Sequence, residues 1–167
     1  MKKIVILGGP GSGKTFCAKK LSQKLNIPVY HLDDYYYKPN WVVVDRAEFI
    51  AKQMEIIRLD AWIIDGNSLG ALSERLTQAD TVIFLDIPRY QRIPRIVWRD
   101  CILNNSANLP PGCIFSWRQF LTFFTNNVWF YAQRRDKILR IIGEHPRVQF
   151  FHLRSSKEVD VFLEEHN

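Results

Sequence analysis

The sequence lacks any apolar run of the length that a membrane-spanning helix needs, and it is poor in cysteine. A spanning helix takes about 18 to 20 consecutive apolar residues, whereas glycines break the short apolar run of MKKIVILGG. The cysteines Cys17, Cys101 and Cys113 and the four histidines show no metal-ligand or CxxC spacing. We therefore expect free thiols in a reducing, cytoplasmic compartment, with no disulfide framework, no zinc site and no membrane partner.

Acidic residues are also fewer than basic ones. Lys and Arg number 23 and Asp and Glu 17, which gives a net charge of +6 and a pI of about 9.3. This balance favours a polyanionic partner, either nucleotide phosphate or nucleic acid, although a soluble surface rich in lysine and arginine has the same balance. At 167 residues, 47% of them apolar, the composition predicts one folded domain and excludes a disordered chain.

Five short apolar segments alternate with segments of helical periodicity along the chain. The predicted strands are residues 3–7, 28–32, 62–64, 81–85 and 148–153. Helices are predicted over residues 14–25, 45–59, 89–103, 116–142 and 155–165, with Asp45 as an N-cap and a proline-containing break at 104–112. Strands separated by helices indicate a parallel sheet covered on both faces, with right-handed crossovers. The sequence therefore predicts a three-layer, doubly wound α/β domain over residues 1–167.

A glycine-rich motif joins the first predicted strand to the first predicted helix. It satisfies the pattern GxxxxGK[ST] with Gly8, Gly9, Pro10, Gly11, Ser12, Gly13, Lys14 and Thr15. The glycines let main-chain N–H groups converge on phosphate oxygens, and the helix start adds the positive end of its dipole. Lys14 supplies a cation for the β- and γ-phosphates, and Thr15 supplies a hydroxyl for Mg²⁺. We therefore predict binding of ATP and Mg²⁺; a glycine-rich turn without a ligand is the alternative.

A second acidic partner for the metal or its water is expected at the end of a neighbouring strand. Asp65 and Asp86 both follow an apolar strand. A carboxylate at a strand end also serves as a helix N-cap, so position alone leaves both roles open for each aspartate.

Six sequence motifs are spread over nearly the whole chain, at residues 8–15, 31–39, 62–67, 79–86, 110–113 and 134–135. Together they resemble the adenylate-kinase-like superfamily of small P-loop kinases, most closely the branch labelled "topology modulation protein". The resemblance implies a P-loop NTPase fold with a five-stranded parallel sheet in the order 2-3-1-4-5. It also implies a small helical lid at about residues 89–115.

The resemblance separates the two aspartates. Asp65 and Gly66 look like the Asp-Gly that ends the third strand of nucleoside monophosphate kinases, which favours Asp65 for the metal and its water. In those kinases a Phe-Pro-Arg follows, and its arginine contacts the acceptor phosphate, whereas residues 67–69 here are Asn-Ser-Leu. The missing arginine counts against an ordinary nucleoside monophosphate as the acceptor.

Residues 32–39 look like the second-strand motif of nucleoside and nicotinamide riboside kinases, in which the first aspartate is the general base. The resemblance implies Asp33 as the base for an acceptor hydroxyl, with Asp34 as the fallback and a turn or capping role as the alternative. Nearby aromatic side chains are compatible with stacking on an acceptor ring, but core packing accounts better for most of them: Tyr35, Tyr36, Tyr37 and Trp41.

Arginines recur at intervals of three and four from residue 89, which places Arg89, Arg92, Arg95 and Arg99 on one side of a helix. Phosphoryl transfer requires cations that neutralise charge on the transferred group. The resemblance implies that Arg95 or Arg99 reaches the phosphates when the lid closes, with Arg134 and Arg135 as a second pair. A solvated basic face is the alternative.

Two other positions are weaker candidates. Arg46 could bind an acidic acceptor, although exposure on the surface explains it as well. Residues 155–158 lie where relatives hold the adenine, and Ser155 fits a helix cap equally well.

The leading hypothesis is transfer of the γ-phosphate of ATP to a small hydroxyl-bearing acceptor, such as a nucleoside or related metabolite, by a monomer or homodimer. One alternative is a nucleotide-dependent protein that binds DNA, which the branch label and the basic charge suggest. No recognition helix or nucleic-acid motif is evident, so we favour it less. The other alternative is an ATPase switch without an acceptor.

Overall fold

The computed structural model describes residues 1–98, 109, 111–113, 117, 121, 124 and 131–166. Five strands form one parallel sheet in the order β2-β5-β1-β6-β7. Counted along the chain, these strands have the order 2-3-1-4-5, so the predicted topology is confirmed. Their bounds are Lys3–Gly8 (β1), Val29–His31 (β2), Trp62–Asp65 (β5), Thr81–Leu85 (β6) and Gln149–Leu153 (β7).

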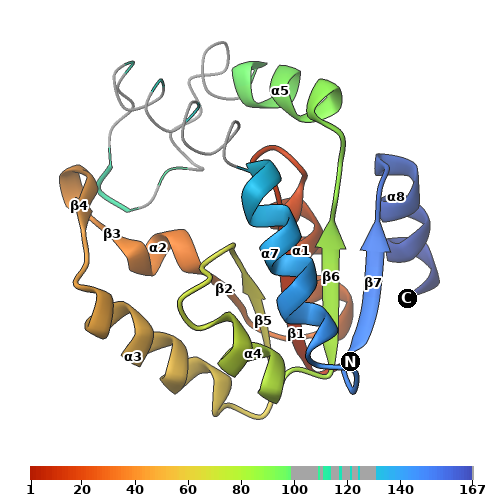
Figure 1. Ribbon diagram of the computed structural model, residues 1–167, viewed down its shortest axis with the longest axis horizontal. Helices are drawn as coiled ribbons and strands as arrows, with labels where there is room; N and C mark the ends of the chain where they lie inside the picture. Colours follow the sequence, from red (N-terminus) through yellow and green to blue (C-terminus); the bar gives the residue numbers. More distant parts are fainter. Residues whose placement is uncertain are drawn as a thin grey trace.

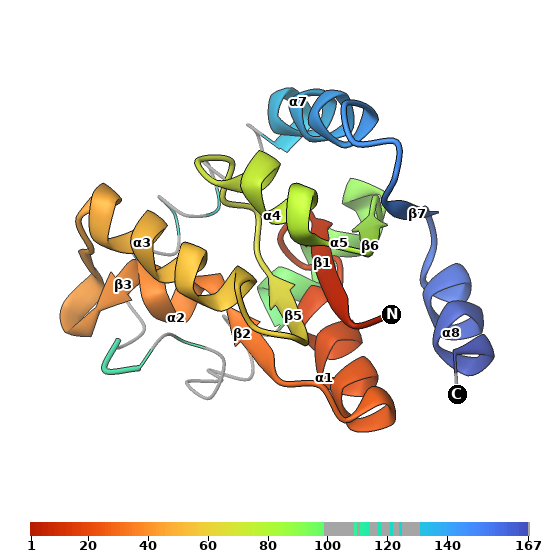
Figure 2. The same ribbon diagram turned by 90° about the horizontal axis from the view of Figure 1, so that it is seen from below.

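Helices cover both faces of the sheet, as Figures 1 and 2 show. On one face, Ile4, Ile6 and Ile83 pack with residues of α1 (Lys14–Leu25) and α8 (Ser156–Glu165). On the other face, Val5, Leu7 and other strand residues pack with α3 (Arg46–Ile57), α4 (Leu72–Gln78) and α7 (Tyr131–Gly143). Alternate strand residues therefore enter two separate apolar layers, which explains why the strands read as continuous apolar runs.

The helix boundaries agree with the expected ones where the capping residue is explicit. Asp45 caps α3, because its Oδ1 accepts hydrogen bonds from the N–H groups of Ala47 (2.8 Å) and Glu48 (3.3 Å). Ser155 caps α8 in the same way, through Glu158 N–H. Helix α5 is described over Arg89–Val97, and residues 99–108 of the expected helix and break lie outside the described part.

The structure also contains elements that the sequence did not predict. The short helix α2 (Leu32–Tyr36) follows β2 directly, and a small antiparallel pair, β3 (Tyr37–Lys38) and β4 (Val42–Val43), extends from it. A 3-10 turn, Pro39–Trp41, joins these two strands. Helix α4 was missed because Arg75 occupies a fully buried position in its apolar pattern.

The carboxyl ends of the strands meet at one edge of the sheet, where β1 continues into the glycine-rich loop and α5 follows β6 (Figure 1). In open parallel sheets, this edge is where ligands bind. Among the described helices, none combines the length and apolarity that a membrane span requires.

Candidate active site

The glycine-rich loop leaves β1 and enters α1 with a backbone that most side chains could not adopt. Gly8 has a φ of 151° and Gly11 a φ of 72°. A Cβ on Gly8 would lie 2.6 Å from the carbonyl oxygen of Leu85, and one on Gly11 would lie 2.7 Å from that of Arg92. Glycine is therefore required at both positions by conformation and by space.

The loop and the first turn of α1 carry potential hydrogen-bond donors for an anion. Gly13 is the N-cap of α1, and no side chain there bonds to the first turn of the helix. The N–H groups of that turn are therefore available to an anion. The Nζ of Lys14 donates to the carbonyl oxygen of Gly9 at 3.2 Å. Lys14 thus folds back over the loop.

The hydroxyl of Thr15 and two side chains from neighbouring strands meet at the base of the loop. Thr15 Oγ1 donates to Asp65 Oδ2 at 2.9 Å, and His31 Nδ1 lies 3.1 Å from the same oxygen. The hydrogen bond to Asp65 raises the pKa of His31, against the effect of its burial. Asp65 is only 5% exposed, and its Oδ1 has no hydrogen-bond partner within the described residues.

These oxygens suit Mg²⁺, which prefers hard carboxylate and hydroxyl ligands and keeps several waters. Thr15 and Asp65 provide a hydroxyl and a buried carboxylate with one unpartnered oxygen beside the phosphate loop. The residues therefore fit the group that the motif implies. Among the described residues, no cluster of three or more His, Cys, Asp or Glu side chains could hold a metal, at this edge or away from it.

Asp33 lies in the first turn of α2, close enough to Lys14 and Asp65 to feel their charges. Desolvation raises the pKa of Asp33, and the cation of Lys14 opposes this increase. Asp33 is exposed to solvent, so water reduces the shift that desolvation would cause. Asp33 also contributes to raising the pKa of Tyr37 to about 12, after the burial of that phenol. A carboxyl group with a raised pKa beside the loop lysine is suited to accept a proton.

The arginines of α5 do not share one environment. Arg92 is buried and donates from Nε to the carbonyl oxygen of Ile87 (2.7 Å) and from Nη1 to that of Pro10 (3.0 Å). Its guanidinium also stacks 4.5 Å from the centroid of the Tyr131 ring. Arg95 is exposed and donates to Ser156 Oγ at 2.8 Å. Arg92 is thus buried beside the phosphate loop while Arg95 is exposed, and Arg99 lies outside the described residues.

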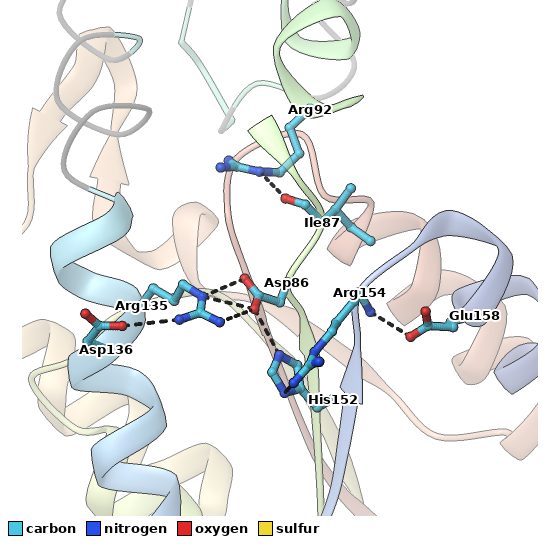
Figure 3. A network of polar contacts seen from close by, with 8 residues as sticks. All are labelled: Asp86, Ile87, Arg92, Arg135, Asp136, His152, Arg154 and Glu158. Atoms are coloured by element: carbon cyan, nitrogen blue, oxygen red, sulfur yellow. Dashed lines mark hydrogen bonds and ion pairs between the residues drawn. The ribbon is translucent and has the colours of Figure 1, made fainter. Parts of the chain in front are cut away.

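Asp86 and Arg135 form an ion pair that joins β6 to α7 (Figure 3). Arg135 donates from Nε to both carboxylate oxygens at 3.0 Å and from Nη2 to Oδ2 at 2.7 Å, while His152 Nε2 lies 2.9 Å from Oδ2. Arg134, its neighbour in the expected pair, is exposed. Because Arg135 and His152 engage Asp86 so closely, Asp65 fits a metal role better than Asp86.

A pocket of about 170 Å³ opens between this ion pair and α5, lined by Asp86, Ile87, Pro88, Arg89, Arg92, Tyr131 and Arg135. Three arginines and one aspartate give it a positive balance. Since Arg92 also contacts Pro10 of the phosphate loop, the pocket lies beside the loop and suits an anion.

The ion pair between Asp86 and Arg135 should stabilise the folded protein in a pH-dependent way. Burial alone would raise the pKa of Asp86, but the bonds from Arg135 and His152 outweigh it and lower this pKa. The ion pair therefore adds its full share to the free energy of unfolding when the pH is above the ordinary aspartate pKa. This share is lost as the pH falls through the lowered pKa of Asp86. Asp86→Asn should lose about 1 to 3 kcal/mol of unfolding free energy at pH 7, with a smaller difference near pH 3, measured by urea unfolding.

Asp136→Asn is the matched control for this prediction. Asp136 also contacts Arg135, at 3.2 Å, but its side chain is 76% exposed, so its loss should change stability by less than about 0.5 kcal/mol. Equal effects of the two substitutions at pH 7 would contradict the assignment of the stabilising bond to Asp86.

A second pocket, of about 280 Å³, lies between α2, β4, α3 and the segment after β5, with a lining of Tyr36, Val43, Val44, Arg46, Phe49, Ile50, Ser68 and Gly70. The Tyr36 and Phe49 rings meet edge to face with centroids 5.1 Å apart. Arg46 is the one charged side chain of the lining. This composition, apolar walls with few polar groups, is typical of small-molecule sites.

Sequence reasoning missed three side chains of this edge: His31, Asn67 and His152. No function was assigned to the histidines, yet His31 contacts Asp65 and His152 contacts Asp86. In both pairs, the histidine and the aspartate lie at the ends of neighbouring parallel strands. This placement could have predicted the two contacts from the sequence. Asn67 bonds the main chain of Gly8, and nothing in the local sequence indicates that contact.

Comparison with known proteins identifies the fold. The sequence matches no protein-family model and no curated protein. Two solved structures align over almost the whole chain. Shikimate kinase from Bacteroides thetaiotaomicron has a TM-score of 0.53 and 18% identity, covering 97% of this chain and 94% of that one. The chain shares the P-loop kinase fold.

Shikimate kinase from Aquifex aeolicus vf5 gives the same TM-score of 0.53 at 16% identity, covering 97% of this chain and 91% of the other. Both likenesses agree with the fold that the sequence motifs implied. At such low identity the agreement concerns the fold, and the chemistry must be argued from the site itself.

Proposed function

We propose that this P-loop protein is an ATP-dependent phosphotransferase that moves the γ-phosphate to a small hydroxyl-bearing acceptor. The observation that carries the proposal is the phosphate loop itself, where Lys14 bonds to the carbonyl oxygen of Gly9 at 3.2 Å. Thr15 of the same loop bonds to the buried Asp65 at 2.9 Å. Asp33 lies in the first turn of the neighbouring helix α2, where desolvation raises its pKa and the charge of Lys14 opposes this increase. A lysine for the terminal phosphates and a carboxyl group with a raised pKa beside it are the two groups that transfer to a hydroxyl needs. The narrower likeness to the "topology modulation protein" branch rests on the sequence motifs.

In the proposed reaction, the N–H groups of the loop and the Nζ of Lys14 bind the β- and γ-phosphates of ATP. The acceptor hydroxyl oxygen attacks the γ-phosphorus, its proton passes to the carboxylate of Asp33, and the bond to the β-phosphate oxygen breaks to release ADP. Thr15 and Asp65 would hold Mg²⁺, which neutralises phosphate charge when bound. Arg92 and Arg135 face the pocket beside the loop, and the exposed Arg95 and Arg134 and the undescribed Arg99 are further candidates for phosphate contact.

The acceptor is proposed to bind in the pocket between α2 and α3. Tyr36 lines this pocket one helical turn after Asp33, so pocket and base lie on the same short helix. Apolar walls and the edge-to-face rings suit a ring-shaped acceptor, and Arg46 suits an anionic substituent on it. Arg46 makes no ion pair or hydrogen bond within the described residues, so it is available to such a group.

The direct test is incubation of the purified protein with ATP, Mg²⁺ and a library of hydroxylated metabolites, followed by mass spectrometry. The library should pair cyclic hydroxy acids with their neutral amides and include nucleosides. We expect one acceptor class to gain a phosphate, with stoichiometric ADP. A parallel Lys14→Ala preparation controls for contaminating kinases. ATP binding without turnover of any acceptor would contradict transfer and favour a nucleotide switch.

A further inference from the structure

The hydrogen-bonded ladder between β1 and β5 ends just before the phosphate loop. The two strands pair in parallel through Ile6 and Asp65, and the N–H of Gly66 then donates to the carbonyl oxygen of Ile6 at 3.3 Å. Gly66 turns the chain away with a φ of 145°, at a position where a Cβ would lie 2.7 Å from the Cβ of Leu32. From Gly66 onward, the main chain of this segment leaves the ladder.

The side chain of Asn67 continues the ladder for one more step. Its Oδ1 accepts a hydrogen bond from the N–H of Gly8 at 3.0 Å, and its Nδ2 donates to the carbonyl oxygen of Gly8. A carboxamide has the same donor and acceptor as a peptide group. Asn67 thus takes the place of the peptide that the departing main chain no longer supplies, on the edge of β1 that faces β5.

The segment that carries Asn67 is itself fixed by a buried arginine. Arg75 is fully buried, and its three nitrogens donate to carbonyl oxygens. Nη1 donates to Gly66 at 3.2 Å, Nη2 donates to Ser68, and Nε donates to Ala71 at 3.3 Å. The first two acceptors are the residues on either side of Asn67. A planar guanidinium that holds both neighbours limits how far the carboxamide can move.

Gly8 is the residue at which the strand becomes the phosphate loop, and its peptide orientation sets the path of the N–H groups that follow. On its other side, Gly8 pairs with Leu85 of β6. With Asn67 bonded on the β5 side, the end of β1 is held from both neighbouring strands. We propose that Asn67 is a positioning residue that preorganises the phosphate loop for nucleotide. The inference rests on the nucleotide-binding part of the proposed function and needs no acceptor.

The test compares nucleotide affinity in variants of residue 67. Calorimetry with the β,γ-imido analogue of ATP and Mg²⁺, well below the unfolding temperature, gives the dissociation constant. Asn67→Leu keeps much of the volume but loses both bonds, and it should bind about 10-fold or more weakly, as expected for one to two lost hydrogen bonds. Asn67→Asp should bind as weakly at pH 7.5, because a carboxylate cannot donate to the carbonyl oxygen of Gly8.

The pH separates a positioning role from a general loss of structure. A protonated carboxylic acid has one donor and one acceptor, so Asn67→Asp should recover affinity relative to the native protein as the pH is lowered toward 5. Asn67→Leu should stay equally weak at both values, which excludes simple relief of charge repulsion as the cause of the recovery. Asn26→Asp makes the same exchange at the far end of α1 and should leave the affinity unchanged, even if it lowers the unfolding temperature.

Two results would overturn this inference while leaving the proposed function intact. One is native affinity, within about twofold, for Asn67→Leu when the native protein binds the analogue. The other is an equal loss of affinity in Asn26→Asp, which would tie binding to stability alone. A native protein that binds no nucleotide would instead overturn the proposed function, and this inference with it.

Discussion

Replacing Lys14 with alanine should weaken the binding of ATP by about 100-fold or more. The lysine is the one loop side chain that carries a full charge, and a hydrogen bond to a charged group contributes roughly 1.5 to 3 kcal/mol. The two terminal phosphates both interact with this cation. Since each 1.36 kcal/mol changes the binding constant tenfold, the loss of the cation corresponds to about 100-fold weaker binding or more. In the structure Lys14 already lies over the loop, bonded to the carbonyl oxygen of Gly9, so little reorganisation opposes its contact with phosphate. Calorimetric titration with ATP and Mg²⁺ measures the effect.

The matched control is Lys20→Ala. Lys20 is exposed on the same helix and contacts the ring of Phe16 at 5.9 Å from its centroid. Its removal changes the net charge of the protein by the same amount as the loss of Lys14. Equal weakening in both variants would mean that overall charge, rather than the phosphate loop, attracts the nucleotide, and the assignment of the loop would fail.

Asp33→Asn should lower the rate of phosphoryl transfer by about 10²- to 10⁴-fold, the contribution of a general base, and should leave the affinity for ATP nearly unchanged. The amide keeps the size of the side chain but cannot accept the proton of the hydroxyl. Asp34→Asn is the comparison, because Asp34 is the adjacent residue and the alternative base. A large loss in Asp34→Asn with native rates in Asp33→Asn would reverse the two roles.

The pH dependence gives an independent reading of the same residue. A base acts when deprotonated, so the rate should fall as the pH drops through the pKa of Asp33. Desolvation raises that pKa, although Lys14 opposes it, so the acid limb of the rate profile should lie above the ordinary aspartate value of about 3.9. The residual activity of Asp33→Asn should lack this limb.

The parts of the site that could be predicted are those encoded by neighbours in the sequence. The loop from Gly8 to Thr15 is contiguous, and each of its residues has a local reason to be there. Three long helices, α1, α3 and α8, were also found within a few residues of their expected bounds, and caps such as Asp45 mark the starts of two of them. Helix α2, at five residues, is too short to show a period.

Contacts between distant segments could not be read in this way. Asn67 meets Gly8 across 59 positions, and Arg92 meets Pro10 across 82. In the sequence, Arg92 has the spacing of an exposed arginine face, and only the packing of α5 against the loop shows that it is buried. Arg75 is similar: it looks like the polar side of a helix but fixes three carbonyl groups. Such residues act on main-chain groups, whose positions depend on the completed fold.

The burial of Arg92 has a consequence for how the protein attracts its ligand. Desolvation lowers the pKa of this guanidinium, and in the described part of the chain it makes no ion pair with a carboxylate. Carbonyl oxygens and the Tyr131 ring stabilise its charge without cancelling it. Folding therefore already includes the free-energy cost of removing this cation from water, so ligand binding does not add it. Under the proposed function, an arriving polyphosphate would meet a positive potential already fixed under the loop, and its association would require no further rearrangement of that charge.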